Sequence, residues 1–504
     1  MKRVLVANRG EIALRIIRAA HEEGMEAVAV YSEADRLSPH VRAADLAIAI
    51  GPSSPADSYL NVTRLIEAAR DSGADAVHPG YGFLAERAHF AQAVLDAGLT
   101  WVGPPPSAIQ AMGDKTEARR RMAAAGVPIV PGLTVPVTDP ATAAAAAEAI
   151  GFPVLVKAAA GGGGKGMRIV RQAGELATAL QMAASEALKS FGDASVYLEK
   201  YVERPRHVEI QVLADATRTV HLGERECSIQ RRHQKLVEEA PSVAVNVALR
   251  EQMGQAAVAA AAAVDYRGAG TCEFLLAADG SFYFLEMNTR IQVEHPVTEL
   301  VYGVDLVREQ LRIASGEPMR VPTGQVIPRG WALECRITSE DATNGFLPAT
   351  GRLEYLRPPA GPGVRWDGGF ETGNEVTLFY DSLLGKIIVW GRNRHDAIIR
   401  MRRALQELII VGVPTNQPFH LRLLQDPDFL NGNIDSQLLD RRPDLTSIVA
   451  DPESALGMAV AAALAEDEAR QSRRPAVERN DSVAATTEQG NWLRTARRES
   501  LRNP

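Results

Sequence analysis

Cysteine is scarce in this sequence, and three other features that would point to particular protein classes are missing. The three cysteines, Cys227, Cys272 and Cys335, are widely separated and form no CxxC pair, so neither a disulfide framework nor a zinc site is predicted. No run of 18 apolar residues occurs, and Arg9 and Glu11 interrupt any signal-peptide core. The net charge of −7 shows no positive excess, which disfavours nucleic acid or an anionic membrane as a partner. We therefore expect a soluble cytoplasmic protein.

Two common nucleotide-binding motifs are also missing. A dinucleotide-binding fingerprint needs G-x-G-x-x-G after the first strand, where residues 7–12 read A-N-R-G-E-I, so an oxidoreductase is disfavoured. A Walker A loop needs a glycine six residues before its lysine and Ser or Thr after it, but Ala159 and Gly166 stand at those places around Lys165.

What is present begins with alternating strands and helices over residues 2–113. Apolar runs predict strands at residues 4–7, 27–31 and 74–78, and helical periodicity predicts helices at 11–23 and 90–97. This order predicts a parallel sheet with helices packed on it. Residues 78–83, H-P-G-Y-G-F, follow a strand at its carboxyl end. Open α/β sheets bind ligands there, although a plain turn explains the segment equally well.

Four consecutive glycines lie between two predicted strands. After a helix at residues 141–150 and a strand at 154–157, the chain reads Gly161-Gly162-Gly163-Gly164-Lys165-Gly166-Met167. The bare amides of such a loop can cradle phosphate, and the loop can move. A surface loop without function is the alternative, but Lys157 and Lys165 at its two ends favour a polyphosphate.

A predicted hairpin leads into an unusual polar row. Apolar runs at residues 274–277 and 282–285 flank the turn signal Asp279-Gly280. While the backbone stays extended, the even-numbered side chains Glu286, Asn288, Arg290, Gln292 and Glu294 share one face. Eight extended residues span roughly 26 Å, enough for a phosphate tail and a second substrate. A polar edge strand is the alternative.

Three further segments carry charge beside apolar residues. Residues 195–202 predict an apolar strand with a charged end, and 206–212 alternate as a strand with a polar face. Residues 226–235, E-C-S-I-Q-R-R-H-Q-K, would by themselves suit a solvated loop equally well.

Together these motifs resemble biotin carboxylase, the ATP-grasp subunit or domain of biotin-dependent carboxylases. The resemblance covers roughly residues 1–445 and is carried by Lys115, Lys157, Gly161–Gly166, residues 199–201, 206–209 and 230–235, Glu273, residues 286–294 and 334–337. Lys165 departs slightly, because the family often has Arg there. The resemblance implies a Rossmann-like N-terminal domain over 1–113, an ATP-grasp domain over 114–316 with a Gly-rich lid at about 131–202, and a mixed α+β domain over 317–445.

The resemblance also implies how ATP and metal are bound. The ATP-binding residues would be Lys115, Lys157, Gly161, Gly162, Gly163, Gly164, Gly166, Met167, Glu199, Lys200, Val202, His207, Gln230, His233, Glu273 and Glu286. Glu273 and Glu286, with Asn288, would hold Mg²⁺ or Mn²⁺, since oxygen ligands suit a hard cation. Each histidine, taken alone, is more often a structural residue.

The implied reaction starts with attack of bicarbonate on the γ-phosphate of ATP. Glu294 would be the base, with Lys235, Arg290, Gln292 and Val293 binding the bicarbonate. The cations Lys235 and Arg290 would make that bicarbonate more acidic. Carboxyphosphate would then release CO₂ to biotin, with Arg336 stabilising the biotin enolate and Tyr81 seating the ring. The residues alone leave two alternatives open: another ATP-grasp ligase, or a non-catalytic nucleotide-binding regulator.

The sequence positions of the lysines indicate whether biotin is attached to this chain. There are eight, at positions 2, 115, 157, 165, 189, 200, 235 and 386, and none lies between two methionines as a biotinylated lysine does. Biotin is therefore expected as a substrate on a separate carrier protein, with a separate carboxyltransferase, in an acyl-CoA carboxylase-type complex. A homodimer is implied by resemblance. In the tail, 446–504, we expect a helix at 453–473, disorder at 474–490, and either a docking segment around Trp492 or no role.

Overall fold

The structure is a computed structural model that describes residues 1–133, 136–137, 139–158, 167–191, 193–232, 234–322, 327–447, 457 and 460–467. The chain divides into two compact units, residues 1–447 and 448–504. In the second unit, residues 460–467 form a helix inside the range predicted for one, while residues 474–490 and Trp492 lie outside the described residues. No helix of the described residues is long and apolar enough to span a membrane.

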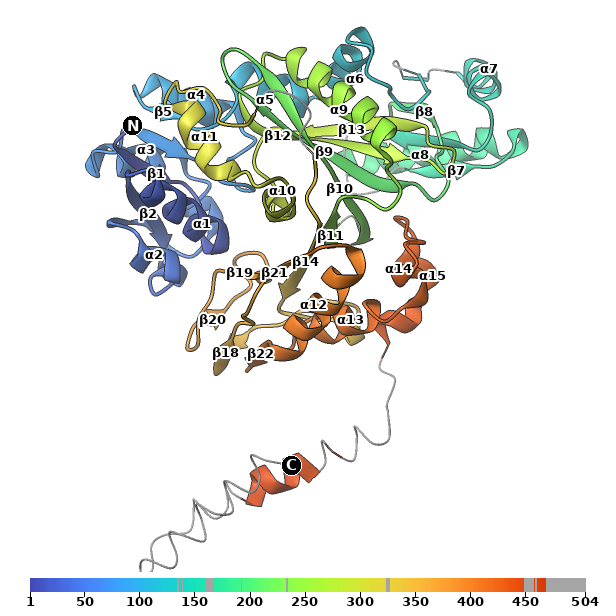
Figure 1. The fold of residues 1–504 in the computed structure, drawn as a ribbon. Helices are drawn as coiled ribbons and strands as arrows, with labels where there is room; N and C mark the ends of the chain where they lie inside the picture. Colours follow the sequence, from blue (N-terminus) through green and yellow to red (C-terminus); the bar gives the residue numbers. More distant parts are fainter. Residues whose placement is uncertain are drawn as a thin grey trace, which may run out of the picture. The chain divides into compact units, whose positions relative to one another are not determined.

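The N-terminal part contains the predicted parallel sheet, drawn in blue in Figure 1. Its strand order is β3-β2-β1-β4-β5, with all pairs parallel. The alternating side chains of β1 and β2 enter two different cores: Val4, Val6 and Ala27 face one, and Leu5 and Val28 face the other. Burial on both faces explains why these strands read as continuous apolar runs. The bounds are β1 (Arg3–Val6), β2 (Glu26–Ser32), β3 (Leu46–Gly51), β4 (Ala76–His78), β5 (Thr100–Trp101), α1 (Gly10–Glu22), α2 (Pro39–Ala43), α3 (Val62–Asp71), α4 (Ala88–Asp96) and α5 (Pro106–Gly113).

A large antiparallel sheet forms the centre of the first unit. Its order is β13-β12-β9-β10-β11-β14-β21-β19, and the pairing of β11 with β14 joins segments on either side of residue 317 into one sheet. Strands from distant parts of the chain thereby become neighbours (Figure 1). The bounds are β9 (Arg206–Ala214), β10 (Thr219–Arg231), β11 (Gln234–Ala240), β12 (Gly268–Leu276), β13 (Phe282–Asn288), β14 (Trp331–Thr338), β19 (Val364–Gly368) and β21 (Leu383–Gly391).

The charged segment 226–235 belongs to this sheet. It forms the end of β10, the turn and the start of β11, and Glu226, Cys227 and Ser228 are buried. The solvated-loop alternative is therefore wrong for Glu226 and Lys235, which form ion pairs with residues of other strands. Arg232, at the turn, is exposed.

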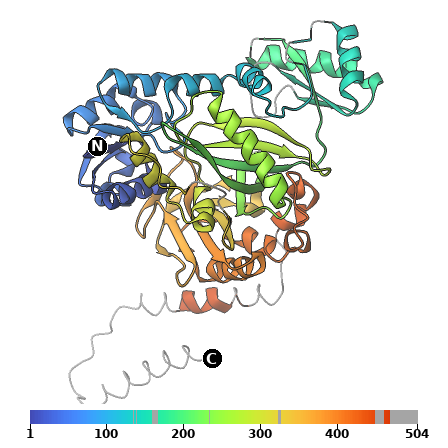
Figure 2. The same cartoon turned by 45° about the horizontal axis from the view of Figure 1, so that its top comes forward.

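A small lobe carries the predicted lid. It consists of α7 (Pro140–Ile150), β6 (Val154–Ala158), β7 (Arg168–Val170), α8 (Leu176–Phe191) and β8 (Val196–Lys200), with strand order β7-β6-β8. Figure 2 shows it in teal beside the central sheet. Its own core includes Ala143, Val156, Leu180 and Leu198. The glycines 161–166 lie outside the described residues.

The remaining helices and strands belong to the middle and C-terminal regions of the first unit. Helices of the middle region are α6 (Lys115–Ala124), α9 (Val247–Ala262), α10 (His295–Tyr302) and α11 (Leu306–Ala314). The C-terminal region adds α12 (Arg394–Glu407), α13 (Gln417–Leu423), α14 (Pro427–Leu430), α15 (Leu438–Arg441), β15 (Glu340–Asp341), β16 (Leu347–Pro348), β17 (Gly351–Arg352), β18 (Tyr355–Arg357), β20 (Glu375–Val376) and β22 (Ile409–Val411).

Candidate active site

The polar row does not stay extended as expected. The predicted hairpin is present as β12 and β13, but its ladder ends at the pair Thr271–Asn288, and residues 289–294 turn before α10 begins at His295. Glu86, from the N-terminal part, holds the start of this turn, since it accepts hydrogen bonds from the Thr289 amide (3.2 Å) and Arg290 Nε (3.0 Å). The single extended face is therefore wrong beyond Asn288. The bend gathers the row into one cluster instead.

Glu273, on β12, is the carboxylate around which that cluster forms. Its Oε1 accepts hydrogen bonds from Lys235 Nζ (2.8 Å), Asn288 Nδ2 (2.8 Å) and Gln292 Nε2 (2.9 Å), and its Oε2 lies 2.9 Å from His207 Nε2. Burial alone would raise the pKa of Glu273, but Lys235 and His207 outweigh burial and hold the pKa well below its usual range. The carboxylate is ionised and charge-paired.

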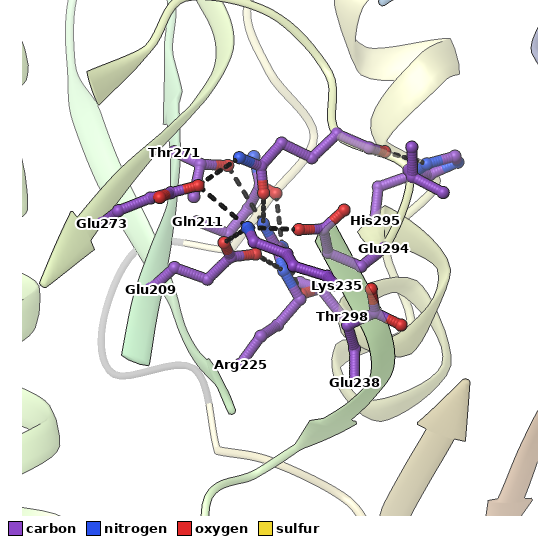
Figure 3. Close-up of polar contacts among 12 residues, drawn as sticks. Glu209, Gln211, Arg225, Lys235, Glu238, Thr271, Glu273, Glu294, His295 and Thr298 are labelled. Carbon is purple, nitrogen blue, oxygen red and sulfur yellow. Dashed lines mark hydrogen bonds and ion pairs between the residues drawn. The ribbon is translucent and has the colours of Figure 1, made fainter. Parts of the chain in front are cut away.

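Lys235 links three carboxylates, as Figure 3 shows. Its Nζ donates to Glu209 (2.6 Å), Glu273 (2.8 Å) and Glu294 (2.7 Å). Burial would lower the pKa of Lys235, but these carboxylates raise it well above its ordinary value. Lys235 therefore remains a cation in contact with both Glu273 and Glu294.

Glu209 is itself fixed by Arg225, a role that the sequence did not reveal. The Arg225 side chain is fully buried and bonds Glu209 Oε1 at 2.5 Å. It also donates to Gln211 (2.7 Å), Thr298 (2.8 Å) and Thr271 (3.0 Å) (Figure 3). The alternation of residues 206–212 predicted a strand with a polar face, and Glu209 and Gln211 lie on that face of β9. Nothing in the sequence distinguished Arg225 from a surface charge.

Glu294 lies between two cations. Its Oε1 bonds Lys235, and its Oε2 accepts from the Arg336 guanidinium at 2.9 Å. Arg336 Nε in turn donates to Glu238 Oε1 at 2.6 Å. Burial opposes ionisation of Glu294, yet Lys235, Arg336 and Arg225 hold its pKa far below the usual range. The predicted base and the predicted biotin-binding arginine thus belong to one network.

Glu238 and Glu334 add two buried carboxyls that the sequence analysis gave no role. They are paired positions on β11 and β14, and neither is exposed to solvent. Burial raises the pKa of Glu238 to about 7, although Arg336 opposes the shift. Burial also raises the pKa of Glu334 well above its ordinary value, and its carboxyl oxygens have no hydrogen-bond partner among the described residues.

The raised pKa of Glu238 predicts a pH-dependent stability. Between its ordinary pKa of 4.5 and its folded pKa of about 7, the folded state binds the proton more tightly, so stability falls as pH rises through this window. From pH 5 to pH 8, wild type should lose roughly 2 to 3 kcal/mol more unfolding free energy than Glu238→Gln. Urea unfolding of both proteins at the two pH values tests this; equal losses would contradict it.

The other residues predicted near bicarbonate and biotin are also close to this network. Arg290 donates to Asn288 Oδ1 at 3.0 Å. The Val293 carbonyl accepts a hydrogen bond from Lys386 Nζ, and the Tyr81 hydroxyl donates to Glu11. Gln230 is the strand partner of Lys235 across β10 and β11.

A second cluster lies in and beside the small lobe. Glu199, on β8, accepts hydrogen bonds from Lys157 Nζ (2.9 Å) and Arg119 (2.7 Å). The Lys200 amide donates to the Pro131 carbonyl at 2.7 Å, so this amide is already paired. Met167 directly precedes β7, Val202 follows β8, and Lys115 begins α6. His233 and glycines 161–164 and 166 lie outside the described residues.

The predicted metal ligands satisfy a simple chemical test. Glu273 and Glu286 are paired positions on β12 and β13, so both side chains leave the same face. The pKa of Glu286 is raised, mainly by loss of solvation and secondly by the negative charge of Glu273. The positive charge of Lys115 opposes this rise. A divalent cation would relieve that repulsion, and oxygen donors suit Mg²⁺ or Mn²⁺. Two other groups also place ligand atoms close enough for a metal, His207–Glu209–Glu273 and Glu209–Cys227–Glu294, but burial raises the pKa of the Cys227 thiol, which disfavours its thiolate.

Comparison with known proteins decides the family. Three family models match in order: Biotin carboxylase, N-terminal domain, over residues 1–109; Carbamoyl-phosphate synthase L chain, ATP binding domain, over 114–321; and Biotin carboxylase C-terminal domain, over 334–441. The biotin carboxylase of Nostoc sp. is 53% identical over 438 residues, which are 87% of this chain and 98% of that protein. The chain belongs to the biotin carboxylase family.

Other biotin carboxylase relatives agree. Biotin carboxylase 1 of Bacillus subtilis is 51% identical over 442 residues, covering 87% of this chain and 98% of that protein. Among solved structures, one is the biotin carboxylase domain dimer of Hydrogenobacter thermophilus 2-oxoglutarate carboxylase, in complex with MgADP, ADP and bicarbonate. It matches with a TM-score of 0.82 at 46% identity, covering 89% of this chain and 99% of that one.

Membership of the biotin carboxylase family confirms the predicted architecture of a parallel-sheet N-terminal domain, an ATP-grasp domain and a mixed C-terminal domain. It also confirms that the chain is an ATP-dependent ligase that forms a carbon–nitrogen bond. The residues alone did not distinguish a biotin carboxylase from another ATP-grasp ligase, and the family membership favours the biotin carboxylase.

Proposed function

We propose that this chain uses ATP and bicarbonate to carboxylate biotin on a carrier protein, releasing ADP and phosphate. The observation that carries the proposal is the position of Lys235, whose Nζ bonds Glu273 at 2.8 Å and Glu294 at 2.7 Å. Through this one ammonium group, a carboxylate suited to metal-bound phosphate is linked to a carboxylate suited to act as a base. A phosphoryl donor and a small acidic anion can therefore meet at Lys235.

Bicarbonate binding explains how a weakly basic Glu294 can act. In the absence of substrate, Lys235 and Arg336 hold the pKa of Glu294 low, although burial opposes them, and such a carboxylate is a poor base. Bicarbonate carries the charge that these cations bind, so it competes with Glu294 for them. When Lys235 turns to the anion, the pKa of Glu294 rises while that of the bound bicarbonate falls. Both changes favour proton transfer to Glu294.

Bicarbonate is positioned by residues of the bent segment. Arg290, Gln292 and the amide of Val293 bind it in the proposal, and Lys235 contributes charge. The Arg290 guanidinium is held by Glu86 and Asn288, which fixes its plane before the substrate arrives. Pre-set donors of this kind lower the barrier because they need no rearrangement when the bond forms.

The nucleotide is assigned to two groups of residues. Glu273 and Glu286, with Asn288, would hold Mg²⁺ or Mn²⁺, which when bound neutralises charge on the phosphate oxygens. Lys115, Lys157 and the glycine loop would contact the phosphates. Glu199, with the backbone at Lys200 and Val202, would hold adenosine, and His207, Gln230 and His233 would line the nucleotide pocket. The Lys157–Glu199 pair at 2.9 Å supports placing the lysine and the adenosine side of the pocket together.

Carboxyphosphate then divides into CO₂ and phosphate. In the proposal the phosphate takes the N1′ proton of biotin, and the biotin nitrogen attacks CO₂ to give carboxybiotin. Arg336 stabilises the negative charge on the ureido oxygen, and Tyr81 seats the ring. The low exposure of Arg336 beside Glu238 and Glu294 strengthens its electrostatic effect, because little water screens it.

The proposal includes partners and compartment. Biotin arrives on a carrier chain, since none of the eight lysines lies between two methionines, and a separate carboxyltransferase uses the product, as in an acyl-CoA carboxylase-type complex. We place the protein in the cytoplasm as a homodimer. Three buried free cysteines suit a reducing compartment, and the dimeric relative from Hydrogenobacter thermophilus supports self-association.

The decisive test measures ADP release with MgATP, with and without bicarbonate and free biotin. We expect ADP release to require bicarbonate and to increase with biotin, with carboxybiotin formed from labelled bicarbonate. ADP release that ignores bicarbonate would overturn the proposal.

A further inference from the structure

Lys386 is a fully buried lysine to which neither the sequence nor the reaction above assigns a role. It lies on β21, and its side chain has no exposed surface. Its Nζ donates to the Val293 carbonyl and lies 3.1 Å from Glu11 Oε1. Lysine is rarely buried unless it is paired, so both contacts require an explanation.

The register of the central sheet places Lys386 beside Arg336. The two are paired positions on β21 and β14, so their side chains leave the same face of the sheet. Arg336 bonds the Glu294 carboxylate, and Lys386 bonds the carbonyl of the preceding residue, Val293. Two neighbouring cations therefore hold two consecutive residues of the segment to which bicarbonate is assigned.

Glu11 connects Lys386 to the N-terminal part of the chain. Its Oε1 also accepts a hydrogen bond from the Tyr81 hydroxyl. The loop that carries Tyr81 is fixed in turn by Asn8, whose Nδ2 donates to the carbonyls of Pro79 and Tyr81, both at 2.7 Å. Gly80, with φ +63°, allows this approach, because a Cβ there would lie 2.9 Å from Asn8 Nδ2. The contacts run continuously from Tyr81 through Glu11 and Lys386 to Val293.

The charges around Lys386 keep it protonated. Glu11, Glu334 and Asp367 face it from α1, β14 and β19, and Arg365 is the nearby opposing cation. Burial would lower the pKa of Lys386, but the carboxylates outweigh burial and the pKa is raised. A charged ammonium binds a carbonyl more strongly than a neutral amine would. Holding that carbonyl fixes the 293–294 peptide plane and so the backbone position of Glu294. It also restrains rotation about the Val293 backbone, whose own amide lies in the preceding peptide plane.

We propose that Lys386 is a positioning residue for bicarbonate, and that Glu11 couples it to the biotin-seating loop at Tyr81. The inference rests on the proposed function. In this arrangement, a movement of Tyr81 on biotin binding reaches the bicarbonate segment through three successive contacts. Bound biotin would then favour the conformation of residues 293–294 that binds bicarbonate.

The first test uses Lys386→Met in the full chain, with Lys189→Met, on the exposed surface of α8, as the matched control. We expect the KM for bicarbonate in the biotin-independent ATPase to rise at least about tenfold, with the KM for ATP changed less than about twofold. Lys386→Arg should recover part of the loss. A lower kcat or melting temperature with an unchanged KM for bicarbonate would reduce Lys386 to a structural residue and overturn the proposal.

Lys386→Met leaves Glu11 buried without its cation, so the variant could be unstable. The double variant Lys386→Met/Glu11→Gln removes both charges and should fold while keeping the raised KM for bicarbonate. If this folded double variant binds bicarbonate as wild type does, the positioning role is wrong. A wild-type enzyme that ignores bicarbonate would instead overturn the proposed function, so the two failures are distinguishable.

Coupling is tested with Tyr81→Phe, which removes one hydroxyl. In wild type we expect biotin to lower the KM for bicarbonate, and in Tyr81→Phe and Glu11→Gln we expect this change to be lost. A wild-type KM that is independent of biotin, or a change that persists in both variants, would overturn the coupling.

Discussion

Glu294→Gln is expected to lower turnover by about a hundred- to ten-thousand-fold, the range associated with loss of a general base. In wild type, Lys235 donates a hydrogen bond to the Glu294 carboxylate at 2.7 Å. Glutamine can still accept that hydrogen bond, but it cannot take a proton from bicarbonate. Because Glu273 keeps its own bonds to Lys235, Asn288 and Gln292, the KM for ATP should stay within about twofold. A large loss in kcat without a loss in ATP binding would therefore identify the proton-transfer step.

Two further variants serve as controls for Glu294→Gln. Glu67→Gln makes the same chemical change at an exposed position of α3 and should leave turnover unchanged. Glu294→Asp keeps a carboxylate but withdraws it from Lys235 and Arg336, so partial activity is expected. Unchanged turnover in Glu294→Gln would remove Glu294 from the role of base, and a parallel rise in the KM for ATP would assign it to nucleotide binding.

Much of the fold could be predicted because its signals are local. The apolar runs of β1 and β2 and the turn at Asp279-Gly280 each depend on a few neighbouring residues. The polar row singled out residues 286–294 as a candidate site, and the resemblance supplied their roles and the remaining site residues. Of these, the structure brings Lys235, Glu273, Gln292, Glu294 and Arg336 into one network.

The rest depends on contacts between distant parts of the chain. The segment that bends after Asn288 is hydrogen-bonded to Glu86, about two hundred residues earlier in the sequence. Arg225, Glu238 and Lys386 look like ordinary surface charges until β10, β11, β14 and β21 are placed in one sheet. Their burial is tolerated because each has a charged or hydrogen-bonding partner, and that partner comes from another strand or helix. No periodicity in the sequence could have shown it.

Arg336→Ala should separate the two halves of the reaction. We expect biotin carboxylation to fall by about a hundred- to a thousand-fold, the cost typical of removing one donor to a developing oxyanion. The biotin-independent ATPase should fall by no more than about tenfold, because Lys235 still contacts Glu294. Both rates can be followed in one sample, as labelled carboxybiotin and as ADP. Equal losses would assign Arg336 to nucleotide chemistry.

A fall in carboxylation could also arise from poor folding, because Arg336→Ala leaves Glu238 buried without the guanidinium that bonds it at 2.6 Å. Arg336 lowers the pKa of Glu238, so without it this buried carboxyl takes up a proton and loses a hydrogen-bond partner, which is costly. The double variant Arg336→Ala/Glu238→Gln removes the titrating group and should recover stability, measured by thermal unfolding. If it recovers stability but not carboxylation, the arginine acts on biotin; if carboxylation returns as well, the arginine serves only as the partner of Glu238.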